Sequence, residues 1–241
     1  MKKILTIFFT AIFVLSMAGI ASAHHLHHYK HQHEALLTDG TGTNGAGEAV
    51  LDINYTLGVS GSVIDDHKNP GKFMQTEGKS VMEFVLSYGL TDALDIALIS
   101  PPTDFGSYLD YGVELKWVFL SGDALNVALK PSITLPFTTA FYGNMLLLFT
   151  EKLGKGFSLN ENLGVSTIGE IHISVSGNIG INDTLTAVLS TGTENTFNTI
   201  FLIGGIGIGV TKGVDLNLGL HADFTNEKSA LYVMSGISLG L

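Results

Sequence analysis

The sequence contains no cysteine and only 5 prolines in 241 residues. Without cysteine the chain has neither a disulfide framework nor the lipid-modified cysteine of a lipoprotein. Scarce proline argues against a proline-rich linker, and the 29 glycines form no collagen-like repeat. After residue 23 there is no apolar run of about 18 residues or more, so we expect no internal membrane helix. What remains is a composition suited to β-structure.

Positive charge is also scarce, with 12 lysines and arginines against 22 acidic residues. Loss of a signal peptide that contains Lys2 and Lys3 changes the formal net charge from −10 to about −12, since two cations and no acids are removed. Nucleic acid and anionic lipid surfaces attract cationic proteins, so an acidic chain is poorly suited to either. We expect no nucleic-acid partner.

The first 23 residues have the three parts of an export signal. Residues 1–3 (Met-Lys-Lys) are the positive end, residues 4–20 are apolar, and residues 21–23 (Ala-Ser-Ala) are a small-x-small cleavage site. The apolar part is a little long, which leaves an uncleaved anchor as the alternative. Nothing after Ala23 resembles a second flank, so we expect cleavage and a mature chain of 218 residues (241 minus 23).

Five turn signals recur at intervals of about 30 residues, each flanked by alternating apolar and polar positions. This interval fits a hairpin of two strands of about 10 residues with its turn and loop. Behind an export signal, it predicts an all-β fold, an antiparallel up-and-down transmembrane β-barrel of about 12 strands over residues 48–241. The turn signals lie at 89–94, 121–125, 154–157, 180–185 and 211–214.

The segment 109–119 shows the clearest strand pattern, with large apolar side chains at every second position and Asp110, Glu114 and Lys116 between them. Residues 145–149 are apolar on both faces, 185–189 are short, and Pro131 is expected to interrupt the hydrogen-bonded ladder of its strand. Short turns face the periplasm and longer loops face outward in such barrels. The longer connections are predicted at 60–79, 100–108, 137–143, 190–197 and 224–229, with a short exception at 167–170.

Aromatic residues near both groups of connections fit the two belts of a membrane barrel. With an even strand number, both termini lie in the periplasm. We therefore expect localisation in the outer membrane of a Gram-negative cell, with outer-membrane lipid and the barrel-assembly machinery as partners. The chain ends in Leu241, whereas many such barrels end in an aromatic assembly signal.

The segment 36–47 reads Leu-Leu-Thr-Asp-Gly-Thr-Gly-Thr-Asn-Gly-Ala-Gly and precedes the first strand. It resembles the opening of the outer-membrane transporters named for the meta-cleavage pathway of phenol degradation, and the hairpin at 88–92 and the strand at 129–136 also fit. Gly40 stands where a second acidic residue is expected, and Asn44 where glutamine is expected. The resemblance implies a β-barrel that passes small, often apolar or aromatic, compounds, and it supplies no mapped binding site.

Strand parity predicts which side chains face the lumen and form the solute path. Acids outnumber bases in this set, which favours cations or neutral solutes over anions. Inward positions at Val81, Val85, Ile99, Val118 and Leu148 favour an apolar solute. The alternative is a salt-bridged core that fills a narrow barrel. The predicted path consists of Glu83, Asp95, Asp110, Glu114, Lys116, Lys130, Glu170, His172, Asp215 and His221, with Asn126, Asn160 and Asp223 on the same face.

Residues 24–47 are expected to form a periplasmic segment that is a candidate plug for the lumen. It begins with a histidine cluster, and imidazole is a common ligand of Zn, Cu and Ni. A tail without metal is the other interpretation, because polar terminal tracts are usually mobile. We expect no other cofactor. The candidate ligands are His24, His25, His27, His28, His31 and His33.

Together these features predict a channel or transporter for passive uptake of small, apolar or aromatic solutes, and not an enzyme. A lipid-modifying enzyme is the first alternative, because His172 or His221 can in principle belong to a Ser–His pair, with Ser174 or Ser176 close to His172. A structural or adhesive barrel with a metal-binding His-rich tail is the second, and its function would lie in the loop at 60–79.

Overall fold

The computed structural model describes most of the chain after residue 39. The described residues are 40–65, 72–75, 78, 80–100, 110–136, 142–154, 156–167, 169–194, 197, 199–225 and 228–241. The predicted signal peptide and the histidine cluster therefore lie outside the described residues. Within the described part of the chain, no helix is long and apolar enough to cross a membrane.

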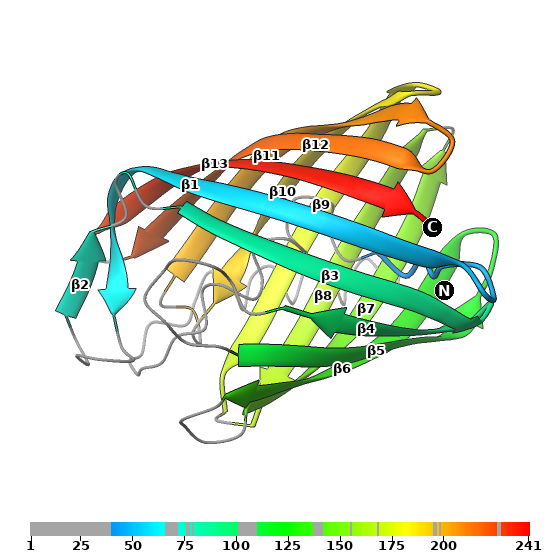
Figure 1. Cartoon of the computed structure of the whole chain (residues 1–241), viewed down its shortest axis with the longest axis horizontal. Helices are drawn as coiled ribbons and strands as arrows, with labels where there is room; N and C mark the ends of the chain where they lie inside the picture. The colour runs from blue at the N-terminus through cyan, green and yellow to red at the C-terminus, as the bar shows by residue number, and fades with distance from the viewer. Residues whose placement is uncertain are drawn as a thin grey trace, which may run out of the picture.

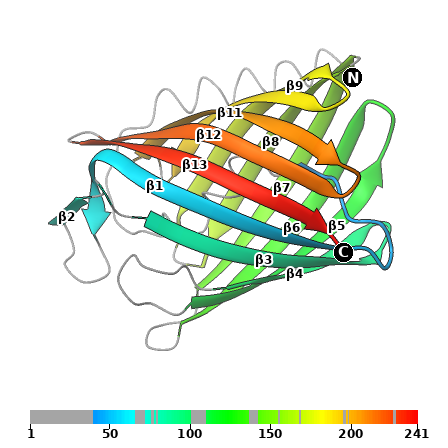
Figure 2. The ribbon, with the colours of Figure 1, turned by 45° about the horizontal axis from the view of Figure 1, so that its top comes forward.

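The chain folds into a closed, antiparallel β-barrel of 12 strands, and a thirteenth short strand, β2, pairs only with the end of β1 (Figures 1 and 2). Apart from β2, strands that follow one another in the sequence pair with one another, and the pairing of β13 with β1 closes the ring. The strands are β1 (Ala49–Asp65), β2 (Lys72–Gln75), β3 (Ser80–Thr91), β4 (Leu94–Ile99), β5 (Asp110–Ser121), β6 (Leu125–Pro136), β7 (Tyr142–Gly154), β8 (Phe157–Ser166), β9 (Ile171–Asn182), β10 (Leu185–Glu194), β11 (Thr199–Thr211), β12 (Val214–Thr225) and β13 (Ser229–Gly240).

The expected long loop at 60–79 contains strand structure. β1 continues to Asp65, and its last residues, 62–65, pair with β2 in a small hairpin beyond the barrel edge (Figure 1). The two segments read Ser-Val-Ile-Asp and Lys-Phe-Met-Gln, and their apolar central residues favour strands. Pairing then satisfies backbone hydrogen-bonding groups of both segments. Likewise β10 continues to Glu194, through the start of the connection expected at 190–197.

The five tight turns lie at one end of the barrel together with the C-terminus and the start of β1, as predicted (Figure 1). Local chemistry explains them. Asn182 Oδ1 accepts hydrogen bonds from the backbone N and Oγ1 of Thr184 at 2.9 and 3.0 Å. Gly213 supplies a φ of 82° in the next turn, a conformation that glycine adopts without a steric penalty. We call this end the turn end, and the opposite end the loop end.

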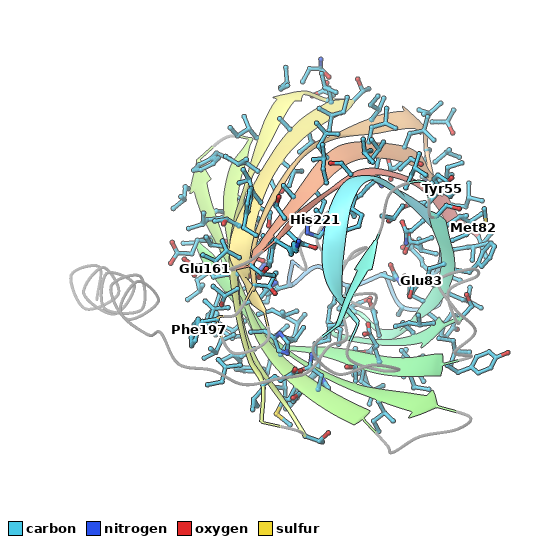
Figure 3. All side chains as sticks on the ribbon, turned by 90° about the vertical axis from the view of Figure 1, so that its left-hand side faces the viewer. Tyr55, Met82, Glu83, Glu161, Phe197 and His221 are labelled. Carbon is cyan, nitrogen blue, oxygen red and sulfur yellow. The ribbon has the colours of Figure 1, made fainter. Side chains whose placement is uncertain are left out.

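Large apolar side chains face outward around the barrel and polar side chains face inward (Figure 3). On β5, Trp117 is 52% exposed, whereas the neighbouring Lys116 points to the lumen. Buried polar side chains include Glu83, Asp95 and Lys130. This distribution is the reverse of that in a soluble protein and matches a barrel whose outer surface meets lipid.

Pro131 interrupts the ladder of β6, as predicted, but on one side only. β6 runs to Pro136, and Pro131 keeps its pairing with Met145 of β7. On the β5 side, residue pairing between the strands stops at Glu114 with Ser132 and resumes at Trp117 with Leu129. Proline lacks the N–H that a ladder needs, so it disturbs one neighbour and not the other.

Candidate functional site: the barrel lumen

The predicted inward side chains divide into separate groups along the lumen. Asp95 and Lys116 lie toward the turn end, Glu114 and Lys130 form a pair on one wall, and His221 with Asp223 lies toward the loop end. Other members of the predicted set lie on the same inner face or directly beside it, but do not converge on one centre. These are Glu83, Asn126, Asn160, Glu170, His172 and Asp215, while the side chain of Asp110 lies outside the described part.

Residues 40–48, which we call the strap, run along the inner side of the turn end. The strap is fixed first to the β3–β4 turn. Gly47 N donates to Gly89 O at 2.8 Å, and Gly89 N donates to Glu48 O at 2.9 Å. Ala46 N donates to Asp92 Oδ1 at 3.1 Å. These bonds set the direction in which the chain enters β1.

The strap then crosses the lumen from the β3–β4 wall to the β7–β8 wall. Asn44 N donates to Asp95 Oδ2, and Asn44 Nδ2 donates to Ser87 Oγ, both at 2.9 Å. Lys116 Nζ on β5 donates to the strap at Gly42 O at 3.3 Å. The far end of the strap is held by a hydrogen bond that Thr41 N donates to Thr150 Oγ1 at 3.0 Å. The strap therefore occupies part of the cross-section of the lumen.

Gly89 is the position that allows this close approach. A Cβ on Gly89 would lie 2.2 Å from Gly45 O and 3.0 Å from Asn44 O, both backbone atoms. No side chain fits there unless the strap moves. The glycine of this hairpin therefore has a structural role that a turn signal alone does not reveal.

One ion pair joins two neighbouring strands inside the lumen. Lys130 Nζ lies 2.9 Å from Glu114 Oε2, and the two side chains are 6% and 12% exposed. A pair this buried requires both partners, because either charge alone would be poorly solvated. The pair also neutralises one of the few inward cations.

Apolar side chains cover part of the same wall. Ala128 of β6 packs with Leu146 and Leu148 of β7, and Val118 of β5 lies against them. Leu148 is fully buried. This explains why the sequence 145–149 is apolar on both faces: Met145 faces outward and is 49% exposed, while Leu146 and Leu148 point inward and are buried against Ala128.

The opposite wall, on β11–β13, has a row of rings. Phe201 and His221 have ring centroids 6.0 Å apart, and those of His221 and Tyr232 are 5.3 Å apart. His221 Nε2 lies 2.6 Å from Asp223 Oδ1. Figure 3 shows His221 on the inner side of the barrel. The acid therefore occupies Nε2 of His221, while Nδ1 has no hydrogen-bond partner among the described residues.

Sequence reasoning missed Phe201, Tyr232 and Met234 as lumen residues. Parity alone can find two of them, since Leu231 and Val233 point outward and leave Tyr232 and Met234 inward. Phe201 is harder, because β11 alternates apolar residues with glycine and the sequence does not show which set faces lipid. Among the described residues, no group of three or more His, Cys, Asp or Glu is placed to hold a metal ion.

No protein-family model and no curated protein matches this sequence. Solved structures do match its fold. The KdgM porin aligns with a TM-score of 0.60 at 7% identity, covering 79% of this chain and 98% of the porin. The NanC porin gives 0.59 at 10% identity, covering 79% and 100%. An outer membrane channel from Pseudomonas putida F1 gives 0.54 at 10% identity, covering 84% and 98%.

The fold is that of a porin-like barrel. At such low identity, the similarity shows the architecture and leaves the solute open. Membership of the phenol-pathway family, to which the opening segment is similar, is not confirmed by these comparisons.

Proposed function

We propose that this protein is an outer-membrane channel for passive uptake of small solutes that are apolar or aromatic and carry no negative charge. The observation that carries the proposal is the lining of the lumen. Apolar side chains cover one wall at Leu146 and Leu148, and rings line the opposite wall at Phe201 and Tyr232. A general water-filled pore has a polar interior, so this lining favours solutes with apolar surface.

The charges of the lumen support the exclusion of anions. Lys130 is paired with Glu114, and Lys116 donates to a strap carbonyl. Asp95 and Asp223 bring negative charge to the two ends. Field lines in a lumen with an excess of acids attract cations and repel anions.

The remaining parts of the proposal rest on sequence. The export signal at 1–23 supports passage to the outer membrane, where lipid and the barrel-assembly machinery are the expected partners. The opening at 36–47 supports relationship to the phenol-pathway transporters. His221 Nε2 is bonded to Asp223, as in a Ser–His–acid triad, but no serine of the described residues is hydrogen-bonded to Nδ1, so the lipid-modifying Ser–His pair gains no support at this histidine. Metal binding by residues 24–33 stays a prediction.

The rate at which solutes enter vesicles that contain lipopolysaccharide and the refolded protein tests this function. Benzylamine, benzyl alcohol and benzoate are similar in size and differ in charge. After subtraction of the rate in protein-free vesicles, we expect rapid entry of the amine and the alcohol and almost none of benzoate. Heat-unfolded protein is the control. Equal protein-dependent rates for all three, or a preference for benzoate, would contradict the proposal.

A further inference from the structure

The row of Phe201, His221 and Tyr232, which we call the ring row, is a built feature of the lumen wall. Phe201 pairs with Asp223, and His221 pairs with Tyr232, so the rings stand on three neighbouring strands. Phe201 is seated against Gly192 of β10, where a Cβ would lie 2.7 Å from its ring. All three ring residues are buried. The geometry is therefore set by the sheet register and by a glycine that makes space.

The ring row is accompanied by hydrogen-bond acceptors that are left unsatisfied. A carboxylate accepts, so in the 2.6 Å contact the proton lies on His221 Nε2, and whenever the imidazole is neutral its Nδ1 is an acceptor. Neither His221 Nδ1 nor Asp223 Oδ2 has a hydrogen-bond partner among the described residues, and the same holds for Thr199 Oγ1. His221 is 4% exposed and Asp223 2%. Buried acceptors of this kind are costly unless a donor reaches them.

An organic ammonium group meets these requirements best. Three N–H donors on one atom can satisfy several acceptors, whereas an alcohol donates once. A carboxylate attracts a cation, and the faces of Phe201 and Tyr232 attract it further. The lumen cations Lys116 and Lys130 contact groups elsewhere, at Gly42 and Glu114. An anion would instead be repelled by Asp223.

The surroundings suit an apolar body attached to that ammonium. Ile203 is fully buried, and Met234 and Ala230 are 1% and 3% exposed on the same inner face. Toward the turn end, the next inward positions on β11 and β12 are glycines, Gly205 opposite Gly219. At this level the two strands present backbone and no side chain to the inside of the barrel.

We propose that the wall formed by β11–β13 holds a binding site for a small organic ammonium ion with an apolar or aromatic body. Asp223 and His221 accept its N–H groups, and Phe201 and Tyr232 contact its cation and ring. The site rests on the proposed function, because a solute reaches it only through the lumen.

Calorimetric titration of the refolded mature protein tests this site. The probes are 2-phenylethylamine and its neutral isostere 2-phenylethanol. We expect the amine to bind at least about tenfold more tightly, because charge-assisted hydrogen bonds are about twice as strong as neutral ones. Asp223→Asn should weaken amine binding about tenfold or more and leave alcohol binding almost unchanged. Asp183→Asn removes an exposed turn carboxylate on the β9–β10 connection and should have no effect.

A second variant protects the test against misfolding of the first. Tyr232→Leu keeps an apolar side chain and should weaken amine binding several-fold through loss of the ring face. Each variant is first checked for the heat-dependent gel shift of a folded barrel. Equal affinity for amine and alcohol, no amine binding, or equal effects of Asp223→Asn and Asp183→Asn would overturn the site. If benzylamine and benzyl alcohol still enter vesicles, only the site fails; if protein-dependent flux is absent for every solute, the channel itself fails.

Discussion

Removal of residues 24–47 is expected to raise the single-channel conductance of the refolded barrel several-fold. The truncation deletes the part of the strap that crosses the lumen and is held by Asp95, Lys116 and Thr150. A segment that lies across a pore reduces the area through which ions move, so its loss should enlarge the current. Planar-bilayer recording of the mature and truncated chains measures this directly.

A point variant separates the strap from a general effect of truncation. Gly89→Val introduces a side chain that collides with the strap backbone, since even the Cβ would lie 2.2 Å from Gly45 O. It should also raise the conductance. Gly154→Val is the matched control, because a Cβ at Gly154, also at the turn end, meets nothing within 4 Å. If all four proteins conduct equally, the strap does not obstruct the lumen.

Lys130→Met is expected to destabilise the barrel by about 3 kcal/mol, because it leaves the Glu114 carboxylate buried without its cation. This value is the lower end of the usual range, since water in a lumen can reach part of the carboxylate. The double variant Glu114→Gln/Lys130→Met should recover most of this stability, because it also removes the carboxylate charge that the single variant leaves without Lys130. Urea unfolding from lipid vesicles measures both.

The comparison of these two variants decides whether the pair matters. A single variant as stable as the unmodified protein would show that the lumen solvates Glu114 fully. A double variant no more stable than the single one would show that packing of the lysine chain, and not charge, accounts for the loss.

Much of the fold follows from local sequence pattern. Strand alternation has a period of two, and turn residues such as Asn182-Asp183 act through neighbouring backbone, so strand positions and barrel closure could be predicted. The hairpin of residues 62–65 with β2 was missed because it is short and joined by polar residues. The predicted interruption of the ladder at Pro131 is found on the β5 side alone, because one missing N–H affects only one of two neighbouring strands.

The candidate site could be predicted only in part. Parity identified inward acids such as Asp95 and Asp223, because a charged residue between apolar ones has only one favourable face in a membrane. The strap contacts could not be predicted, since Thr41 meets Thr150 across 109 residues of chain and only after the ring closes. The ring row was hidden for the same reason, because its members come from three strands and the phase of β11 is ambiguous.

Cysteine scanning of β9 tests the central claim most directly, since the chain has no cysteine of its own. Ser174 and Asn178 face the lumen, while the adjacent Val175 and Ile179 face outward. Single cysteines at these four positions are treated with a small cationic thiol reagent in the refolded protein. A solute-accessible lumen predicts rapid reaction at 174 and 178 and little at 175 and 179. Reaction only at 175 and 179, or at none of the four, would contradict it.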